Sequence, residues 1–180
     1  MNSRSGKFVS YYRPYLGLFM MDMACAFVVS AVTLLLPLCM RFVTKNILEG
    51  NAPNALSQIY MMGAIMLALV AIHTACSLFV DYQGHMMGAL MESDIRRELF
   101  DHYQKLSFRF YDEQRTGQLM TRITNDSFDL AELFHHGPED IAISSLNFIG
   151  AFIILFSIDV ELTLIVLLFL PIMAIYAFYF

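Results

Sequence analysis

The stretch LSFRFYDEQRTGQLMTRITND, residues 106–126, is a polar segment with turn-forming residues, and a long helical pattern lies on each side of it. Both patterns become apolar over lengths that suit a membrane. We therefore expect this segment to join two helical limbs outside the bilayer, where it is well placed to contact a molecule in the aqueous phase.

The composition is that of an integral membrane protein. Hydrophobic residues make up 58% of the chain, aromatic residues 14% and charged residues only 15%, outside ordinary globular usage. A 25-residue helix is about 37 Å long and exceeds a bilayer core of about 30 Å. The pattern predicts an all-α membrane protein with four transmembrane helices, at residues 16–40, 59–80, 141–158 and 162–180.

Basic residues indicate the orientation. Of the eleven Lys and Arg residues, nine lie before the first span or between the second and third, and only Arg41 and Lys45 lie elsewhere. The positive-inside rule then places the N-terminus and residues 81–140 in the cytoplasm, for a protein of the cell membrane. Tyr11, Tyr12 and Tyr15 suit the interfacial belt. Arg41 follows the first run without a small-residue cleavage site, which favours a retained span over a cleaved signal peptide.

The two external connections are short, so the spans should form two antiparallel hairpins. Beyond the second span, apolar residues continue at helical spacing among charged ones, as at Met87, Met91 and Ile95. One helix over residues 56–108 would be about 80 Å long, with roughly 45–50 Å beyond the bilayer core. Its mixture of charges indicates a solvated surface and argues against nucleic acid as a partner.

The return limb shows a second apolar face. Its residues recur at separations of four and seven: Leu119, Ile123, Leu130, Phe134 and Ile141. Gly137 and Pro138 should interrupt the limb with a kink near the membrane, because proline lacks an amide hydrogen and clashes with the preceding turn.

Between the limbs, residues 110–117 are predicted to form a helix of one or two turns. Asp112 would be its N-cap, Arg115 would lie late in the turn, and Gly117 would stop it. Arg122 and Asp126 are four residues apart, so we interpret them as a local structural pair at the base of the loop.

Ionisable and amide groups inside the spans are costly unless they face protein or water. Asp22, His73 and Asn147 are therefore hypothesised to line a cavity. For Asp22 there is an alternative, because it lies only about 10 Å along the helix from Tyr15 and could be solvated from the cytoplasmic side.

The chain contains no sequence pattern for catalysis. It has no Walker-type phosphate loop, zinc-protease motif or nucleophile elbow. Cys25, Cys39 and Cys76 match no metal or redox spacing and are interpreted as small core residues. Glu132 and His135 form a single Glu-x-x-His pair where di-iron bundles use two, so a solvated helix face is favoured and no metal site is expected.

In the loop, the sequence resembles the transmembrane domain of ATP-binding cassette (ABC) exporters, which commonly carry Phe-Phe-Asp, then Gly-Glu-Leu, then Arg and Asp. The corresponding residues are Phe110, Tyr111, Asp112, Gly117, Gln118, Leu119, Arg122 and Asp126. The resemblance extends through Pro37, residues 147–150 and Pro171 and so covers essentially the whole chain. It implies the N-terminal portion of a half-transporter subunit, four spans of a six-helix domain.

The resemblance also implies a function. The loop would carry a coupling helix that docks on a nucleotide-binding domain, through Phe110, Tyr111, Asp112, Glu113, Gln114, Arg115, Thr116 and Gly117. A homodimer or heterodimer in the lipid bilayer would form the substrate pathway, and the intact transporter would use ATP and Mg. The chain itself has no ATPase site, and because it ends at Phe180 inside an apolar run, we expect it to be truncated. The alternative is a non-transporting membrane scaffold or sensor that binds a cytoplasmic partner through the same loop.

Overall fold

The structure is a computed structural model that describes residues 10–50 and 54–179, and within these ranges all regular structure is helical. The main helices are α2 (Leu16–Phe42), α3 (Ala55–Tyr103), α6 (Ser127–Ile158) and α7 (Val160–Tyr179). With their helical extensions, the four stretches are long and apolar enough to cross a membrane. The prediction of an all-α membrane protein with four spanning helices is confirmed.

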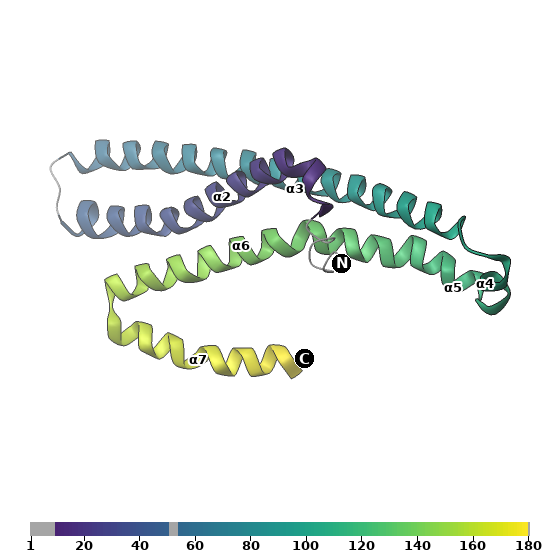
Figure 1. The fold of residues 1–180 in the computed structure, drawn as a ribbon. Helices are drawn as coiled ribbons and strands as arrows, with labels where there is room; N and C mark the ends of the chain where they lie inside the picture. Colours follow the sequence, from purple (N-terminus) through teal and green to yellow (C-terminus); the bar gives the residue numbers. More distant parts are fainter. Residues whose placement is uncertain (1–9, 51–53, 180) are drawn as a thin grey trace.

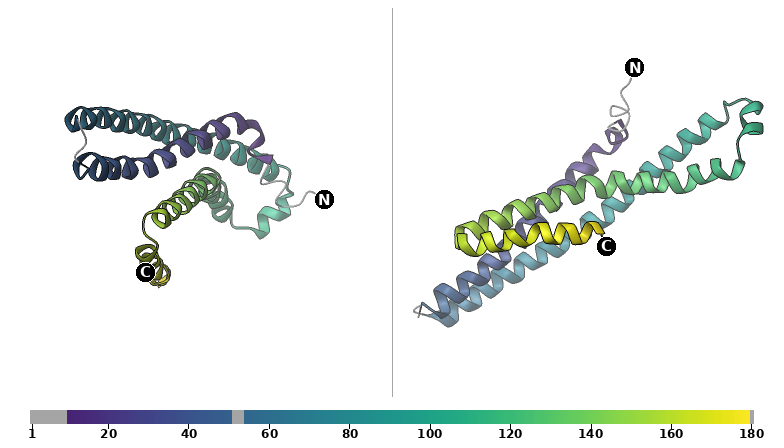
Figure 2. Two further views of the ribbon diagram at one scale, coloured as in Figure 1. Left: turned by 90° about the vertical axis from the view of Figure 1, so that its left-hand side faces the viewer. Right: turned by 90° about the horizontal axis from the view of Figure 1, so that it is seen from below.

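The helices form two antiparallel hairpins, as predicted. Figure 1 shows α2 paired with α3 and α6 paired with α7, with both short connections at the same end of the molecule. At the other end, α3 and the return limb extend past the start of α2 to a small tip. In Figure 2 the second hairpin crosses the first obliquely, and α7 lies farthest from it, in contact chiefly with α6.

Local chemistry explains where the hairpins turn. Asn54, directly before α3, has a left-handed backbone (φ 60°, ψ 37°), a conformation that asparagine tolerates better than most residues. Asp159 has an extended backbone that ends α6. Its carboxylate accepts a hydrogen bond from the Leu162 amide at 3.0 Å, so the same residue caps the start of α7.

Helix α3 provides the long limb. It has 49 residues without a break, and ends at Tyr103, five residues before the predicted end at Phe108. There the amides of Lys105 and Leu106 donate to the carbonyls of His102 and Tyr103 at 3.1 and 3.0 Å. These tighter three-residue turns use carbonyls that the last helical turn leaves available.

The best-packed core lies where the N-terminal segment meets α3 and α6. It consists of Tyr12, Met87, Met91, Ile95 and Phe134. The apolar face predicted on α3 is therefore confirmed at this level. Ring contacts join Tyr12 to Phe134 and Phe19, with centroids 5.3 and 5.2 Å apart and edge-to-face geometry.

The predicted apolar face of the return limb is correct as far as Phe134 and wrong at Ile141. Phe134 is fully buried, whereas Ile141 is 69% exposed. The buried face of α6 instead continues through His135 and Glu139. Ile141 lies two residues beyond Glu139, about 200° round the helix, and therefore points away from α2 and α3.

Helix α6 continues through Gly137 and Pro138, so these residues do not end it, and the kink expected there stays a prediction. Proline has no N–H, so Pro138 cannot donate to the Phe134 carbonyl as the residue four positions on normally would. The Tyr12 hydroxyl donates to that carbonyl instead, at 2.7 Å in a buried position. The N-terminal tyrosine thus supplies the hydrogen bond that the proline removes.

We expect Tyr12→Phe to lower the free energy of unfolding by about 1–3 kcal/mol, because it leaves a buried carbonyl without this donor. In a Pro138→Ala background the new amide can donate, so the same substitution should cost clearly less. Unfolding of the purified protein in mixed micelles measures both differences. Tyr11→Phe is the control, since the Tyr11 hydroxyl bonds to the exposed Glu98 carboxylate. Equal losses from Tyr12→Phe in both backgrounds would contradict this role of Tyr12.

Candidate functional site

The tip, residues 108–121, contains two short helices, α4 (Phe108–Glu113) and α5 (Thr116–Thr121). Gln114 and Arg115 between them have extended backbones, which divides the single helix predicted over residues 110–117. That prediction is wrong in detail. Asp112 lies in the last turn of α4 and is no N-cap, while Gly117 lies inside α5 and stops nothing.

Aromatic residues of α4 fall into two groups. The Tyr111 hydroxyl donates to the Tyr103 carbonyl at 2.6 Å, and its ring packs edge-to-face on Phe110 with centroids 5.5 Å apart. The Tyr111 hydroxyl therefore fixes α4 to the end of α3, and Phe110 packs against the Tyr111 ring. Phe108 is 90% exposed and Met120 on α5 is 54% exposed. The sequence analysis did not single out Phe108 or Met120. An apolar residue inside a polar loop was the signal that could have identified them.

The two limbs are tied together just before the tip. The Arg96 guanidinium donates to the carbonyls of Ile123 and Thr124 at 3.2 and 3.4 Å and pairs with Glu92. Those carbonyls lie in a wide, π-type helical turn, Arg122–Asp126. Because this turn alters the four-residue spacing, the described structure has no ion pair between Arg122 and Asp126, and the predicted pairing is wrong.

At the inner end of the limbs, three buried side chains meet, and we call them the buried triad: Asp22 of α2 with His135 and Glu139 of α6. They are only 2%, 3% and 7% exposed. His135 Nδ1 and Glu139 Oε2 lie 3.5 Å apart. Asp22 is therefore not solvated from outside, and His135 does not lie on a solvated helix face, so both of these interpretations are wrong.

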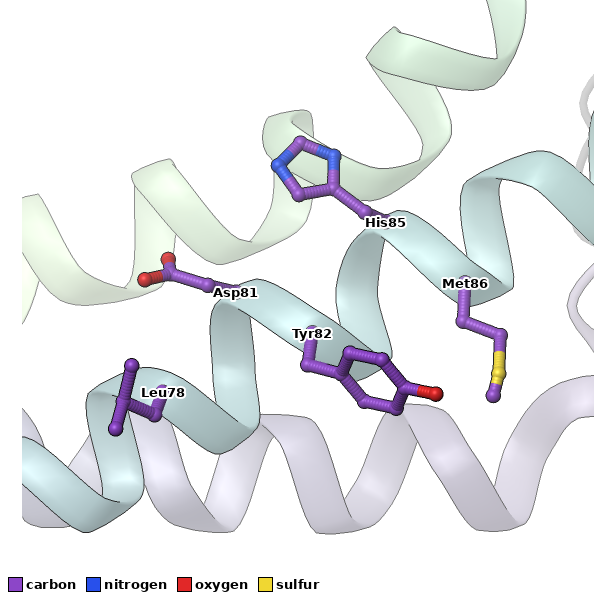
Figure 3. A pocket seen from close by; sticks show the side chains of 5 residues that line it. All are labelled: Leu78, Asp81, Tyr82, His85 and Met86. Carbon is purple, nitrogen blue, oxygen red and sulfur yellow. The ribbon is translucent and has the colours of Figure 1, made fainter.

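Two more histidines adjoin the triad. The His85 ring of α3 lies edge-to-face with His135 and His136, at centroid distances of 5.1 and 5.5 Å. Figure 3 shows His85 and Asp81 on the side of α3 toward α6, at an open pocket that Leu78, Tyr82 and Met86 also line. Glu132 Oε2 lies 3.4 Å from His136 Nε2, so Glu132 pairs with His136 and not with His135. The carboxylate next to His135 is that of Glu139.

Gly84 creates the space for His135. A Cβ built on Gly84 would lie 1.7 Å from His135 Cε1, so only a glycine fits with the ring in this position. One turn further along α3, a Cβ on Gly88 would be 3.6 Å from the His135 Cβ, an ordinary contact. The close approach of α3 and α6 places the imidazole directly against the α3 backbone.

The other two polar residues predicted to line a cavity lie apart from the triad. His73 Nε2 is 3.5 Å from Thr33 Oγ1, a contact between α3 and α2. Asn147 is half-buried on α6. A cavity of about 290 Å³ between α2 and α6 is lined by other residues, mainly apolar: Phe27, Ser30, Ala31, Leu34, Leu146, Ile149, Gly150 and Ile153.

This fold of long helical hairpins with an exposed tip agrees with the comparison to protein families. Residues 19–180 match the family described as the ABC transporter transmembrane region. The chain belongs to this family. The resemblance recognised in the loop sequence is thereby confirmed at the level of the family.

Individual relatives from the ABC transporter family cover nearly the whole chain. The uncharacterized ABC transporter ATP-binding protein YwjA of Bacillus subtilis is 38% identical over 97% of this chain and 30% of its own length. The putative multidrug export ATP-binding/permease protein YgaD of the same organism is 29% identical over 97% of this chain and 30% of its own. The chain therefore spans about a third of the length of these relatives.

The space that Gly84 leaves for the His135 ring can be tested by substitution, with Gly88 as the matched control. Gly84→Ala and Gly88→Ala give α3 the same gain in helix propensity, but only the first collides with His135. We expect Gly84→Ala to be less stable than Gly88→Ala by about 1–3 kcal/mol, the usual effect of overpacking. Thermal unfolding of the purified variants measures the difference. Equal stability would mean that His135 relocates freely.

Proposed function

We propose that this chain is the N-terminal, membrane-spanning part of an ATP-driven ABC exporter, and that its tip docks on a nucleotide-binding domain. The family membership supports a transporter. YgaD is named as a putative multidrug export ATP-binding/permease protein and YwjA as an ABC transporter ATP-binding protein, and this chain corresponds to 30% of the length of each. A nucleotide-binding domain would then belong to the remainder of such a protein, and with it ATP and Mg.

One observation carries the docking proposal: an almost fully exposed phenylalanine stands at the end of two stiff, connected limbs. Phe108 is 90% exposed on α4, while Tyr111 and Arg96 hold the tip and the limbs in one arrangement. A short element fixed in this way moves as a rigid unit, so a displacement at the tip becomes a tilt of α3 and α6. Exposed residues of the predicted coupling segment, Asp112, Gln114, Arg115, Thr116 and Gly117, would surround the contact.

The remaining parts of the proposal concern orientation and assembly. Nine of the eleven Lys and Arg residues lie before the first span or between the second and third, which supports a cytoplasmic tip and N-terminus in the cell membrane. Much apolar surface of α6 and α7 is exposed, as a lipid bilayer and a second transmembrane subunit in a homodimer or heterodimer would require. Asp22, His73 and Asn147 stay proposed as residues that line the pathway during transport.

Phe108→Ala tests the docking role in the intact transporter. Its phenyl ring touches little within this chain, so the variant should fold normally but lose substrate-stimulated ATP hydrolysis about tenfold, or bind the nucleotide-binding domain correspondingly more weakly, as for a hot-spot aromatic residue. Phe128→Ala is the control, because Phe128 is 50% exposed on α6 outside the tip. Stimulated ATPase activity in proteoliposomes is the measurement.

Wild-type coupling in a folded Phe108→Ala variant would contradict docking through this residue. A second variant, Phe110→Ala with Tyr111→Ala, then decides whether the rest of the tip is involved. If partner binding is present but no variant of the tip changes an ATPase rate, the scaffold or sensor alternative is favoured.

A further inference from the structure

The buried triad contains polar atoms that the protein leaves without hydrogen bonds. Asp22 Oδ1, His135 Nδ1 and Glu139 Oε2 are each inaccessible to solvent and lack a hydrogen-bond partner. Leaving such a group unpaired costs about 1–3 kcal/mol, and more for a charged one. Three such side chains, each with one ligand atom within 4.8 Å of the other two, are therefore not explained by packing.

The charges around the triad are also unbalanced. The charged neighbours that act on Glu139 are Asp22, Asp140, Asp81 and His136, with no Lys or Arg among them. Buried carboxylates normally pair with a basic side chain or coordinate a metal. A divalent cation would balance the two buried carboxylates, which no Lys or Arg among these neighbours does.

The geometry suits a metal ion. One ligand atom from each of Asp22, His135 and Glu139 lies within 4.8 Å of the others. In a tetrahedral site with bonds of about 2.0–2.1 Å, ligand atoms are about 3.3 Å apart. His135 Nδ1 and Glu139 Oε2, at 3.5 Å, already have nearly this separation, and rotamer adjustments of the carboxylates would close the rest.

We propose that Asp22, His135 and Glu139 bind a divalent transition-metal ion of the Zn²⁺ class. One imidazole and two carboxylates form a nitrogen and oxygen ligand set that suits Zn²⁺, Mn²⁺ or Co²⁺ and lacks the thiolates of soft-metal sites. Asp22 comes from α2 and the other ligands from α6, so the bound ion joins the first and third spans. Gly84 is a positioning residue, because a side chain there would displace the His135 ring.

The outer histidines form the entrance to this site. His85 is exposed and His136 is half-buried, and each presents a ring nitrogen within 4.8 Å of one of the His135 nitrogens. They can hold an incoming ion at the pocket in Figure 3 before it reaches the carboxylates. The inference does not depend on the transport function, because metal binding is measured without ATP or substrate.

The test uses the intact purified protein, stripped with a chelator and titrated with Zn²⁺ or Co²⁺ chloride. We expect one equivalent to bind, Co²⁺ to develop the intense visible absorption of a low-coordinate site, and the unfolding temperature to rise with metal concentration. Asp22→Asn and Glu139→Gln preserve the side-chain shape and should each weaken binding at least about tenfold, since even outer-shell changes cost 10–100-fold. His73→Asn is the control, because His73 lies on α3 beside Thr33.

The variants also distinguish this site from two alternatives, a histidine site at the surface and a cluster that binds no metal. Undiminished binding in folded Asp22→Asn and Glu139→Gln, with loss in a variant combining His85→Ala and His136→Ala, would overturn the proposal in favour of a histidine site at the surface. No binding of Zn²⁺ or Co²⁺ by the wild type would overturn it as well, and would leave a cluster that shares a proton. Loss in both carboxylate variants, with binding to His73→Asn unchanged, supports the buried site.

Discussion

The hydrogen bond from the Tyr12 hydroxyl to the Phe134 carbonyl is the contact on which the arrangement of the three-helix junction depends. Pro138 removes the normal helical donor to that carbonyl, and in a membrane protein water is a poor substitute. The Tyr12 hydroxyl, from a segment 122 residues away, donates to this carbonyl, and α6 remains helical past Pro138 into its apolar part. The same ring completes the core formed by Met87, Met91, Ile95 and Phe134.

Stiff limbs extend from this junction toward the tip. Tyr15 donates to Asp94 at 2.7 Å, and Arg96 reaches the carbonyls of the return limb. Successive ties along α3 therefore connect the N-terminal segment, the long helix and the wide turn before α6. Helices joined by such contacts would move together as one rigid unit, as the proposed coupling role requires. Phe108 lies outside this packing, and we propose that it contacts the partner domain.

At the buried triad, close packing of the helices isolates polar groups from water. Gly84 lets α3 approach α6 so closely that the His135 imidazole lies against backbone, which excludes water from the polar atoms of Asp22 and Glu139. Isolated polar groups at this depth are expensive, so their persistence calls for a ligand or a shared proton. A conformational change that separates α2 from α6 would open the triad, and the proposed metal binding would then depend on the arrangement of these helices.

The sequence by itself determined the spans, the two hairpins and the long limb of α3, because apolar length and helical period are local properties of the chain. It also identified the loop that carries the tip. Tertiary structure alone decided that Pro138 is accommodated, that the tip divides at Gln114, and that Asp22, His135 and Glu139 meet. The residues of the triad are up to 117 positions apart, and only His135 and Glu139 share a helical spacing. Their meeting depends on which faces of α2, α3 and α6 pack together, and periodicity within one helix carries no information about its neighbour.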